Sequence, residues 1–435
     1  EGVKKNQHIA VESLITDCLQ NLIRDGIPRE LVNSSLHQLE IRQREITGSG
    51  MPFGLQIMLT CLPACIHNDD PLNILDLDNA FNVIKERLNR DNYIEGLIEK
   101  HLINNPHKLN SSLVPDTELN RRNEEAIVKK VHQKTESLTV DDKNKIVALA
   151  EDLEKRQERI DDPEILPKVT KEDIPLSRNY PNPNISVVNN IENYFYKSGT
   201  NGLVYHSMLF PCEALTIDEL KIASLFTSSL TDIGLGSDSY EDVQKYQSSI
   251  TGGISASFTM IPNKGDSEHK LALKISGKSL EKNAHLMQDL MIRTVQEANF
   301  GEHQRIQELL SFISADNEQS LTQNGHVLAM ANAASQLTEV ASTNDLTSGI
   351  RFINNTGLLS KNISDEGSLD IYIKNLKSIQ SKISLTPKNI FTASSLNQDE
   401  MDLKSFSGLN AADVDEQNFT KVQDKSIGWI TGSQV

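Results

Sequence analysis

Histidine and glutamate are the residues of this 435-residue chain whose types and spacing come nearest to a catalytic site. A helical metal site of the hydrolytic kind uses two histidines one turn apart, with a carboxylate between them to deprotonate the metal-bound water. The nearest approach is His37-Gln38-Leu39-Glu40, where the fifth position is Ile41 and cannot ligate a metal. Neither the His-x-x-Glu-His nor the His-Glu-x-x-His order occurs. We therefore expect this chain to hold no zinc and to cleave no peptide bond on its own.

Other residues that could carry chemistry lack the partners that their chemistry needs. Ser255 and Ser257 lie outside a Gly-x-Ser-x-Gly elbow, so no turn exposes their hydroxyl groups as nucleophiles. The segment Gly234-Leu235-Gly236 has neither a third glycine nor a preceding strand, which argues against a phosphate-binding loop. Cys61 and Cys65 are four residues apart and could meet on one helix face. Because no second Cys/His pair has zinc spacing, we interpret both cysteines as small buried hydrophobic residues.

Charge and composition restrict the partners. A net charge of -17 argues against nucleic acid, because phosphate recognition needs clustered lysine and arginine. A negative surface serves solubility, and attraction of basic peptides remains the alternative interpretation. No apolar run reaches about eighteen residues, so we expect no contact with a membrane. Four cysteines are too few for a disulfide framework and favour a reducing, cytoplasmic compartment, with a mitochondrion or other organelle as the alternative if a targeting peptide has been removed.

Three sequence patterns divide the chain into elements. Residues 10–105 have the apolar periodicity of packed helices. In residues 115–160 acidic and basic residues alternate around sparse apolar positions, which predicts two solvated helices packed through a narrow seam, separated by a capping box at Thr139 and Asp142. A binding site for a coiled-coil or calmodulin-like partner is the alternative. Prolines spread over residues 161–183 then predict an extended linker. The apolar seam positions are Ile127, Val131, Leu138, Ile146, Leu149 and Leu153.

Beyond residue 184 the pattern is strand, strand, helix, strand, strand and further helices, which predicts an α+β layer with a mixed sheet and helices on one face. One strand begins directly after Gly252 and Gly253. Two consecutive glycines free the backbone for a tight turn or a close approach, and the alternation that follows fits one buried sheet face. We therefore predict a structural hinge at Gly252 and Gly253, with no catalytic or metal-binding residue elsewhere in the chain.

Short motifs in a fixed order connect this chain to a known family. They are Met51-Pro52-Phe53-Gly54-Leu55, Asn105-Pro106-His107, Thr200-Asn201-Gly202-Leu203-Val204-Tyr205, Leu230-Thr231 with Gly234, Ser239-Tyr240-Glu241, Thr251-Gly252-Gly253-Ile254-Ser255, Ser276-Gly277-Lys278 and Gly325-His326. With this order and spacing the chain resembles the presequence-peptidase branch of the pitrilysin/insulinase zinc metallopeptidase family. Each motif is weak alone, and the resemblance depends on their combined order from about residue 10 to about residue 355.

The resemblance implies a fold and a domain plan. The family builds LuxS/MPP-like metallohydrolase layers into a clamshell whose halves are joined by a long helical hairpin. By that plan residues 1–114 are the C-terminal part of a second peptidase-like domain and residues 115–183 are the hairpin and linker. Residues 184–390 are then a third α+β domain, and residues 391–435 begin a fourth. The zinc ligands of the family lie in its first domain, and an arginine and a tyrosine that reach the substrate lie beyond the last strand present here.

The function implied by the resemblance is that of a non-catalytic middle portion. The full-length enzyme would be a zinc metalloendopeptidase that degrades unfolded, presequence-like oligopeptides inside a closed chamber. Its cofactor would be zinc, with none expected in this chain. Its partners would be the remaining halves of the peptidase and peptide substrates. A natural scaffold or partner subunit of the same superfamily, which lacks zinc, is the alternative.

Overall fold

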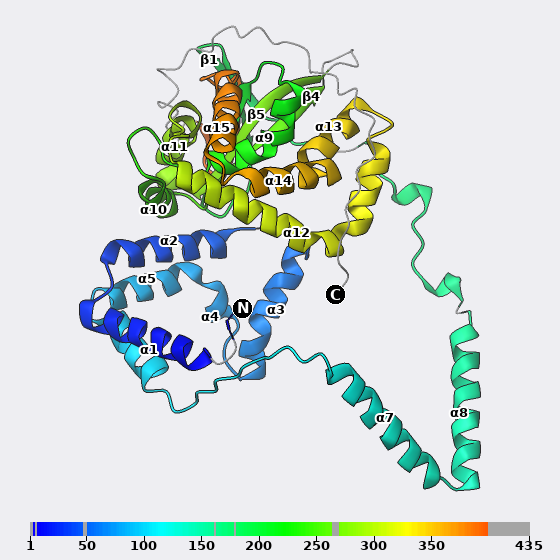
Figure 1. Cartoon of the computed structure of the whole chain (residues 1–435). Helices are drawn as coiled ribbons and strands as arrows, with labels where there is room; N and C mark the ends of the chain where they lie inside the picture. The colour runs from blue at the N-terminus through cyan, green and yellow to red at the C-terminus, as the bar shows by residue number, and fades with distance from the viewer. Residues whose placement is uncertain are drawn as a thin grey trace. The chain divides into compact units, whose positions relative to one another are not determined.

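A computed structural model shows the arrangement of the elements (Figure 1). It describes residues 3–398, with the exception of residues 5–6, 47–49, 161, 178–179 and 263–268. The chain divides into two compact units, which we describe separately. The first unit joins Glu1–Gly26 to Asn92–Tyr180, and the second joins Ile27–Asp91 to Pro181–Val435.

The first unit is helical, and its helices bury few side chains. Helix α1 packs against α6 and against the π-helix η1, which directly follows α6 in the chain. Two three-residue 3-10 helices lie in the proline-rich tract, and its other described residues form no helix or strand. The elements of this unit are α1 (His8–Asp25), α6 (Tyr93–Ile98), η1 (Glu99–Ile103), α7 (Leu119–Glu136), α8 (Val140–Glu158), η2 (Pro163–Ile165) and η3 (Lys171–Asp173).

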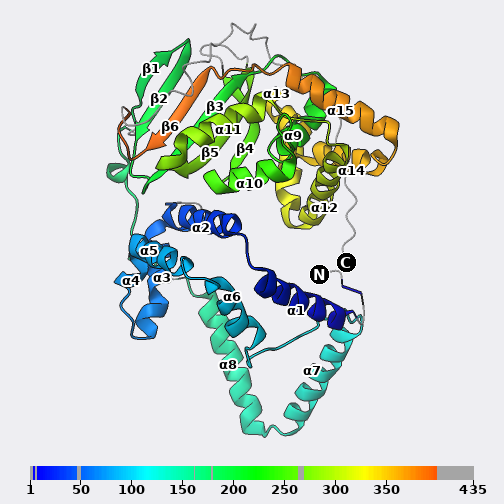
Figure 2. The same ribbon diagram turned by 90° about the vertical axis from the view of Figure 1, so that its left-hand side faces the viewer.

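Helices α7 and α8 lie where the sequence predicts them, but the predicted seam between them is wrong. The Thr139 side chain accepts the Asp142 N–H and Asp142 accepts the Thr139 N–H, so the predicted capping box is confirmed. Neither helix has a buried residue. Val131 is 59% exposed and Leu149 is 71% exposed. The apolar positions of both helices are therefore open to solvent, because the two helices do not pack along their lengths (Figure 2).

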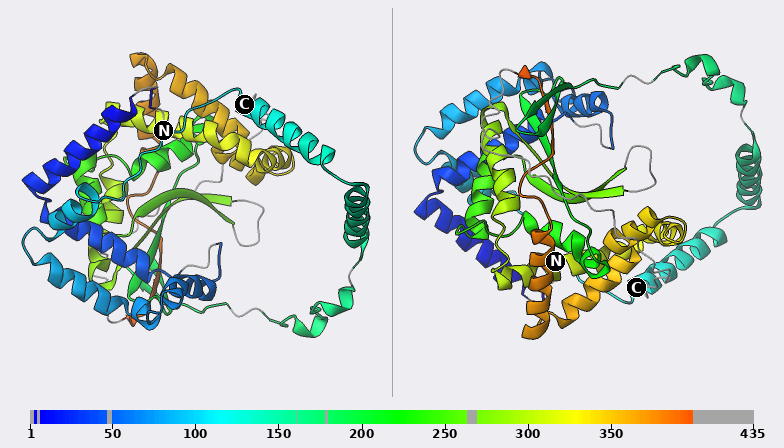
Figure 3. Two further views of the ribbon diagram at one scale, coloured as in Figure 1. Left: turned by 90° about the horizontal axis from the view of Figure 1, so that it is seen from below. Right: turned by 90° about the horizontal axis from the view of Figure 1, so that it is seen from above.

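A six-stranded sheet organises the second unit. Its order is β1-β2-β6-β3-β5-β4, which is visible from left to right in Figure 2. Strand β6 pairs in parallel with β2 and antiparallel with β3, so the sheet is mixed. The strands β4 and β5 form a strongly curved antiparallel pair (Figure 3). The strands are β1 (Asn184–Val188), β2 (Ile191–Lys197), β3 (Leu203–Pro211), β4 (Ile254–Pro262), β5 (His269–Leu280) and β6 (Asn389–Ser394).

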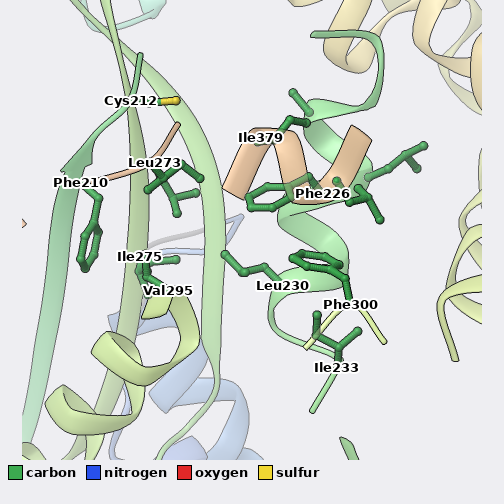
Figure 4. Packing of buried hydrophobic residues seen from close by; sticks show 14 of the residues in the cluster. Phe210, Cys212, Phe226, Leu230, Ile233, Leu273, Ile275, Val295, Phe300 and Ile379 are labelled. Atoms are coloured by element: carbon green, nitrogen blue, oxygen red, sulfur yellow. The ribbon is translucent and has the colours of Figure 1, made fainter. Parts of the chain in front are cut away.

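The main core lies between one face of this sheet and a layer of helices. Phe226 of α9 lies near its centre and stacks on Phe300 with ring centroids 5.5 Å apart (Figure 4). Phe210 and Leu273 point into the same core from neighbouring strands. The helices of this layer are α9 (Ile217–Leu230), α10 (Tyr240–Ile250), α11 (Ala284–Gln296), α12 (His303–Ala334), α13 (Glu339–Ser348), α14 (Ile350–Asn362) and α15 (Glu366–Ser381), with the short 3-10 helix η4 (Glu281–Asn283) before α11. The predicted α+β class with a mixed sheet is confirmed.

Four helices from an earlier part of the chain complete the second unit. They are α2 (Arg29–Arg44), α3 (Phe53–Ile66), α4 (Leu72–Leu75) and α5 (Leu77–Leu88). Helix α2 packs on α10 and on α5. The sequence-based domain boundaries remain predictions. The boundary at residue 390 falls inside β6, whose residues pair within this sheet.

Candidate functional site

The predicted hinge lies at a contact between helix α2 and the end of the sheet. Helix α2 follows Pro28, carries Glu30 in its first turn and ends in arginines, which is the charge order that favours a helix. Its buried residues are His37, Glu40 and Ile41. This spacing of three and four residues places the three side chains on one face. We call this face, with the residues that it contacts around Gly252, the α2 clamp.

Ile41 is the apolar centre of the α2 clamp. It is 2% exposed and packs with Leu203 of β3 and Leu280 of β5. A Cβ atom added to Gly252 would lie 2.7 Å from Ile41 Cγ2 and 3.0 Å from the Lys278 side chain. Carbon atoms in favourable contact lie about 3.5–4.0 Å apart. Glycine at position 252 therefore makes room for Ile41.

Gly253 has a different role from Gly252. Its φ is +108°, a backbone conformation that side chains with a Cβ rarely adopt, and nothing lies within 4 Å of the Cβ that it lacks. The Gly253 N–H donates to the Thr251 hydroxyl oxygen. The Gly252 N–H donates to the Lys278 carbonyl at 2.7 Å, one residue out of the register that begins at Ile254 and Gly277. The two glycines thus form an irregular turn that leads into β4, and their action as a hinge stays a prediction.

Polar contacts fix helix α2 on both sides of Ile41. The Gln38 amide nitrogen donates to the backbone carbonyl oxygens of Ser248 and, at 2.6 Å, of Thr251. The Lys278 ammonium lies 2.6 Å from both carboxylate oxygens of Glu45, directly after the helix. Both partners of this ion pair are largely buried, with side chains 28% and 21% exposed. These contacts join one helix to α10, to the glycine turn and to β5.

His37 is buried in the α2 clamp with one nitrogen unsatisfied. It is 9% exposed, and its Nε2 has no hydrogen-bond partner among the described residues. Burial lowers the pKa of His37 below its usual value, a hydrogen bond to the Ile250 carbonyl opposes this shift, Lys282 adds to it, and Glu40 weakly opposes it. The imidazole therefore remains neutral to lower pH than an exposed histidine.

Helix α2 is also linked to helix α5, through Glu40 and Arg44. The Glu40 carboxylate lies 3.0 Å from Arg44 and 3.5 Å from Lys85, and Arg44 also pairs with Asp78. Burial lowers the pKa of Arg44, but hydrogen bonds to Asp78 and Glu40 outweigh it and raise the value. Helix α2 is therefore held by ion pairs to α5 as well as by the packing of Ile41 against the end of the sheet.

The other residues considered from sequence do not gather into a catalytic site. Among the described residues, no three His, Cys, Asp or Glu side chains lie close enough to hold a metal ion. The interpretation of both Cys61 and Cys65 as buried is wrong, because Cys61 is only partly buried and Cys65 is exposed. Ser255 is exposed on the sheet, and its hydroxyl reaches only the Ser276 carbonyl, at 3.5 Å.

Sequence reasoning missed a buried polar network in the sheet. His206 of β3 is 1% exposed, with Nδ1 2.8 Å from the Thr392 hydroxyl and Nε2 2.6 Å from the Gln288 amide. Burial lowers the pKa of His206 to about 3, so the ring is neutral at physiological pH. Both ring nitrogens are engaged by uncharged partners, which is the arrangement of a structural histidine. The alternation of β3 predicts that position 206 faces the core, but only the fold brings Thr392 beside it.

Comparison with known proteins identifies the family of this chain. The profile of the family described as peptidase M-16C associated matches residues 113–358, which is more than half of the chain. The chain belongs to this peptidase-associated family. This result confirms the resemblance to the presequence-peptidase branch. Within the matched range lie α7, α8, the glycine turn and helices α9 to α13.

Curated relatives extend the match to most of the chain. Presequence protease 1, chloroplastic/mitochondrial, of Arabidopsis thaliana is 26% identical over 84% of this chain and 34% of its own length. Mitochondrial presequence protease of Yarrowia lipolytica is 26% identical over 90% of this chain and 39% of its own. Protein HypA of Clostridium perfringens is 24% identical over 81% of this chain and 36% of its own. The chain therefore spans little more than a third of the length of these relatives.

One solved structure, a conserved protein from Enterococcus faecalis, is similar at 14% identity with a TM-score of 0.32 over 55% of this chain and 53% of that chain. A similarity at this level assigns no layering to the sheet and helices. Every helix among the described residues is too short or too polar to cross a lipid bilayer.

Proposed function

We propose that this chain is the non-catalytic middle portion of a zinc metalloendopeptidase that degrades unfolded, presequence-like oligopeptides in a closed clamshell chamber. The observation that carries the proposal is membership of a peptidase-associated family, together with relatives named presequence protease that are about two and a half times as long. In this proposal the zinc ligands belong to another part of the full-length protein, because the chain has no inverted or forward zinc motif. The sheet and its helices would be one LuxS/MPP-like layer of the chamber wall.

The α2 clamp has a mechanical role in this proposal. Its ion pairs and the Ile41 contact fix a helical segment to the end of the sheet. A displacement of α2 would therefore move β5 and the glycine turn with it. Helices α7 and α8 would connect the halves of the enzyme, and their lack of buried residues favours bending at low free-energy cost.

A natural scaffold or partner subunit without zinc is the second candidate. The absence of a zinc motif in the sequence supports it equally well. The compartment is also part of the proposal. Two of the relatives carry mitochondrial or chloroplastic names and a third is bacterial, so cytoplasmic and organellar locations both have support.

The test compares this chain with the full-length protein that contains it. Elemental analysis should find no stoichiometric zinc in the chain, and a fluorogenic unstructured peptide should remain uncut. The full-length protein should bind zinc, lose activity to a chelator, cleave peptides of a few tens of residues and spare folded proteins. Chelator-sensitive cleavage by the chain alone would refute the assignment as non-catalytic. A full-length protein without zinc or peptidase activity would favour the scaffold.

A further inference from the structure

The sheet has a second face, which points away from its helix layer. Helices α9 and α11 pack against β4 and β5. Ile191 of β2, Met208 of β3 and Ile390 of β6 point from the sheet into the core that these helices cover. Successive side chains of a strand point to opposite faces of the sheet. The residues that alternate with these three therefore point away from the helices.

Large apolar and aromatic side chains gather on this second face where β1, β2 and β6 form one end of the sheet (Figure 2). Ile185 lies opposite Tyr194, and Tyr194 lies opposite Phe391. Ile185 and Val187 are 61% and 62% exposed, and both rings are partly exposed. Exposed apolar patches mark interaction sites. We call this surface the aromatic face, and its residues are Ile185, Val187, Tyr194, Tyr196, Leu209 and Phe391.

The aromatic face is ordered by contacts among its own residues. The ring of Tyr194 stacks on that of Phe391 with centroids 4.9 Å apart and an interplanar angle of 13°. The Tyr194 hydroxyl donates to Glu192 Oε2 at 2.7 Å, and the Asn389 amide nitrogen donates to the same oxygen at 2.9 Å. Side chains that are already held lose little conformational entropy when a ligand binds. The rings and the carboxylate are therefore prepared for a ligand.

The carboxylate beside the rings determines which side chain fits best. Glu192 forms no ion pair within the described part of the chain, and no described residue donates to its Oε1 atom. A guanidinium group is planar, stacks on aromatic rings and donates hydrogen bonds to carboxylates. The ammonium group of lysine is compact and more strongly hydrated. Aromatic rings next to an available carboxylate oxygen therefore favour arginine over lysine.

The lysines of the same sheet face lie at a distance from this carboxylate. Lys274 of β5 lies opposite Leu209, and Lys278 is paired with Glu45. Glu192 and Lys274 stand in one cross-strand row, three strand intervals or about 14 Å apart. Charges on a surface are largely screened beyond about 8 Å at physiological salt. The net charge of -17 of the whole chain also attracts basic ligands.

We propose that the aromatic face binds unfolded basic peptide segments, with arginine side chains on the rings of Tyr194 and Phe391 and against Glu192. Apolar side chains of the peptide cover Ile185 and Val187. Arginine-rich, acid-poor segments of this kind are typical of presequences, and the choice of an unfolded peptide as ligand rests on the proposed function. A second copy of this chain is disfavoured as occupant, because two copies of net charge -17 repel each other.

Binding of labelled peptides to the 435-residue chain, measured by fluorescence anisotropy, tests this proposal without any catalytic step. The probe is a twelve-residue peptide that repeats leucine, arginine and serine, and two matched peptides carry lysine or glutamate in place of arginine. The arginine peptide should bind about two- to fivefold more tightly than the lysine peptide, because the guanidinium group stacks on the rings. The glutamate peptide should bind at least about tenfold more weakly than the arginine peptide, since its charge has the sign of the chain.

Two protein variants assign the binding to the aromatic face, each with a matched control. Phe391→Leu keeps an apolar side chain but removes a ring, and it should reduce the preference for arginine over lysine to less than about twofold. Phe312→Leu is its control, because Phe312 is 72% exposed on α12. Glu192→Gln should weaken binding of the arginine peptide by about threefold. Glu366→Gln, on the exposed surface of α15, removes the same charge elsewhere and should have no effect.

The outcomes separate this inference from the proposed function. A chain that binds the arginine peptide as expected, in a full-length protein without zinc, would retain the inference and refute the proposed function. Equal binding of the arginine and lysine peptides, or a control variant that matches its test variant, would overturn the inference. So would a dimer of the chain that the arginine peptide dissociates. If circular dichroism shows that Phe391→Leu is unfolded, Glu192→Gln and the three peptides decide.

Discussion

Replacement of Gly252 by alanine should strain the α2 clamp through Ile41. The new Cβ would lie 2.7 Å from Ile41 Cγ2, and the end of the sheet and α2 hold these atoms from opposite sides. Insertion of a methyl group into a packed site costs about 1–3 kcal/mol. The alanine also reduces the conformational entropy of the unfolded chain, which stabilises the folded state by about 0.4–1 kcal/mol, since the backbone of Gly252 has no positive φ. We expect a net loss of about 1–2 kcal/mol of folding free energy.

A double-mutant cycle attributes this loss to one contact. Ile41→Ala alone should cost about 2–5 kcal/mol because the side chain is fully buried. In that background the methyl group of Gly252→Ala no longer meets Ile41, so its cost should fall by a coupling of about 1–2 kcal/mol, and the contact with the Lys278 side chain at 3.0 Å accounts for any cost that remains. Gly253→Ala is the matched control. It should cost about 1–3 kcal/mol in both backgrounds, because its strain comes from a φ of +108° and not from a neighbour.

Urea unfolding followed by circular dichroism gives the free energies, and hydrogen exchange of the Arg29–Arg44 amides reports separation of α2 from the sheet. Gly252→Ala should speed exchange in α2 more than in the core strands. An equal cost of Gly252→Ala with and without Ile41 would refute the steric argument. A cost of Gly253→Ala that changes when Ile41 is replaced by alanine would also refute this argument.

Three further predictions address titration and exposure. Below about pH 6.5 the hydrogen-exchange protection of α2 should decrease as pH falls through the lowered pKa of His37, because the released form binds more protons, and His37→Gln should remove this pH-dependent component. The imidazole of His206, with a pKa of about 3, should show no NMR titration between about pH 8 and pH 5, and a midpoint in that range would contradict the buried network. Leu149→Lys should change stability by less than about 0.5 kcal/mol, since Leu149 is 71% exposed, and a larger loss in thermal unfolding would mean that α8 packs against another element.

Local features of the fold were predictable because neighbouring residues determine them. The capping box at Thr139, the strand after Gly253 and the helices follow from spacing and residue type. The exposure of the apolar positions of α7 and α8 was not predictable, because apolar periodicity identifies a helix face and does not say whether anything covers that face. The same limit applies to Cys65, which is exposed on a helix that is apolar on most sides.

The candidate site was predictable only in part. The glycine pair marked a turn, but Ile41 lies more than two hundred residues earlier in the sequence, and no local signal connects the two positions. The helical spacing of His37, Glu40 and Ile41 indicates a buried face, but the sequence does not show that α2 packs on α10. Long-range pairs of this kind depend on the whole fold, and a single sequence leaves them undetermined.

The position of β6 determines the order in which this sheet can be completed during synthesis. Strand β6 is the last described strand in the chain, yet it lies between β2 and β3. Until Asn389–Ser394 leave the ribosome, the β1–β2 hairpin and the three-stranded sheet β3–β5–β4 remain two separate pieces, each with an unpaired inner edge. Strand pairings between residues that are nearly two hundred positions apart in the sequence form slowly, and strand edges that remain unpaired during this time favour aggregation. A nascent chain that stalls before Asn389 would therefore expose the unpaired edges of β2 and β3 at the centre of its own sheet. A chaperone would need to cover these edges.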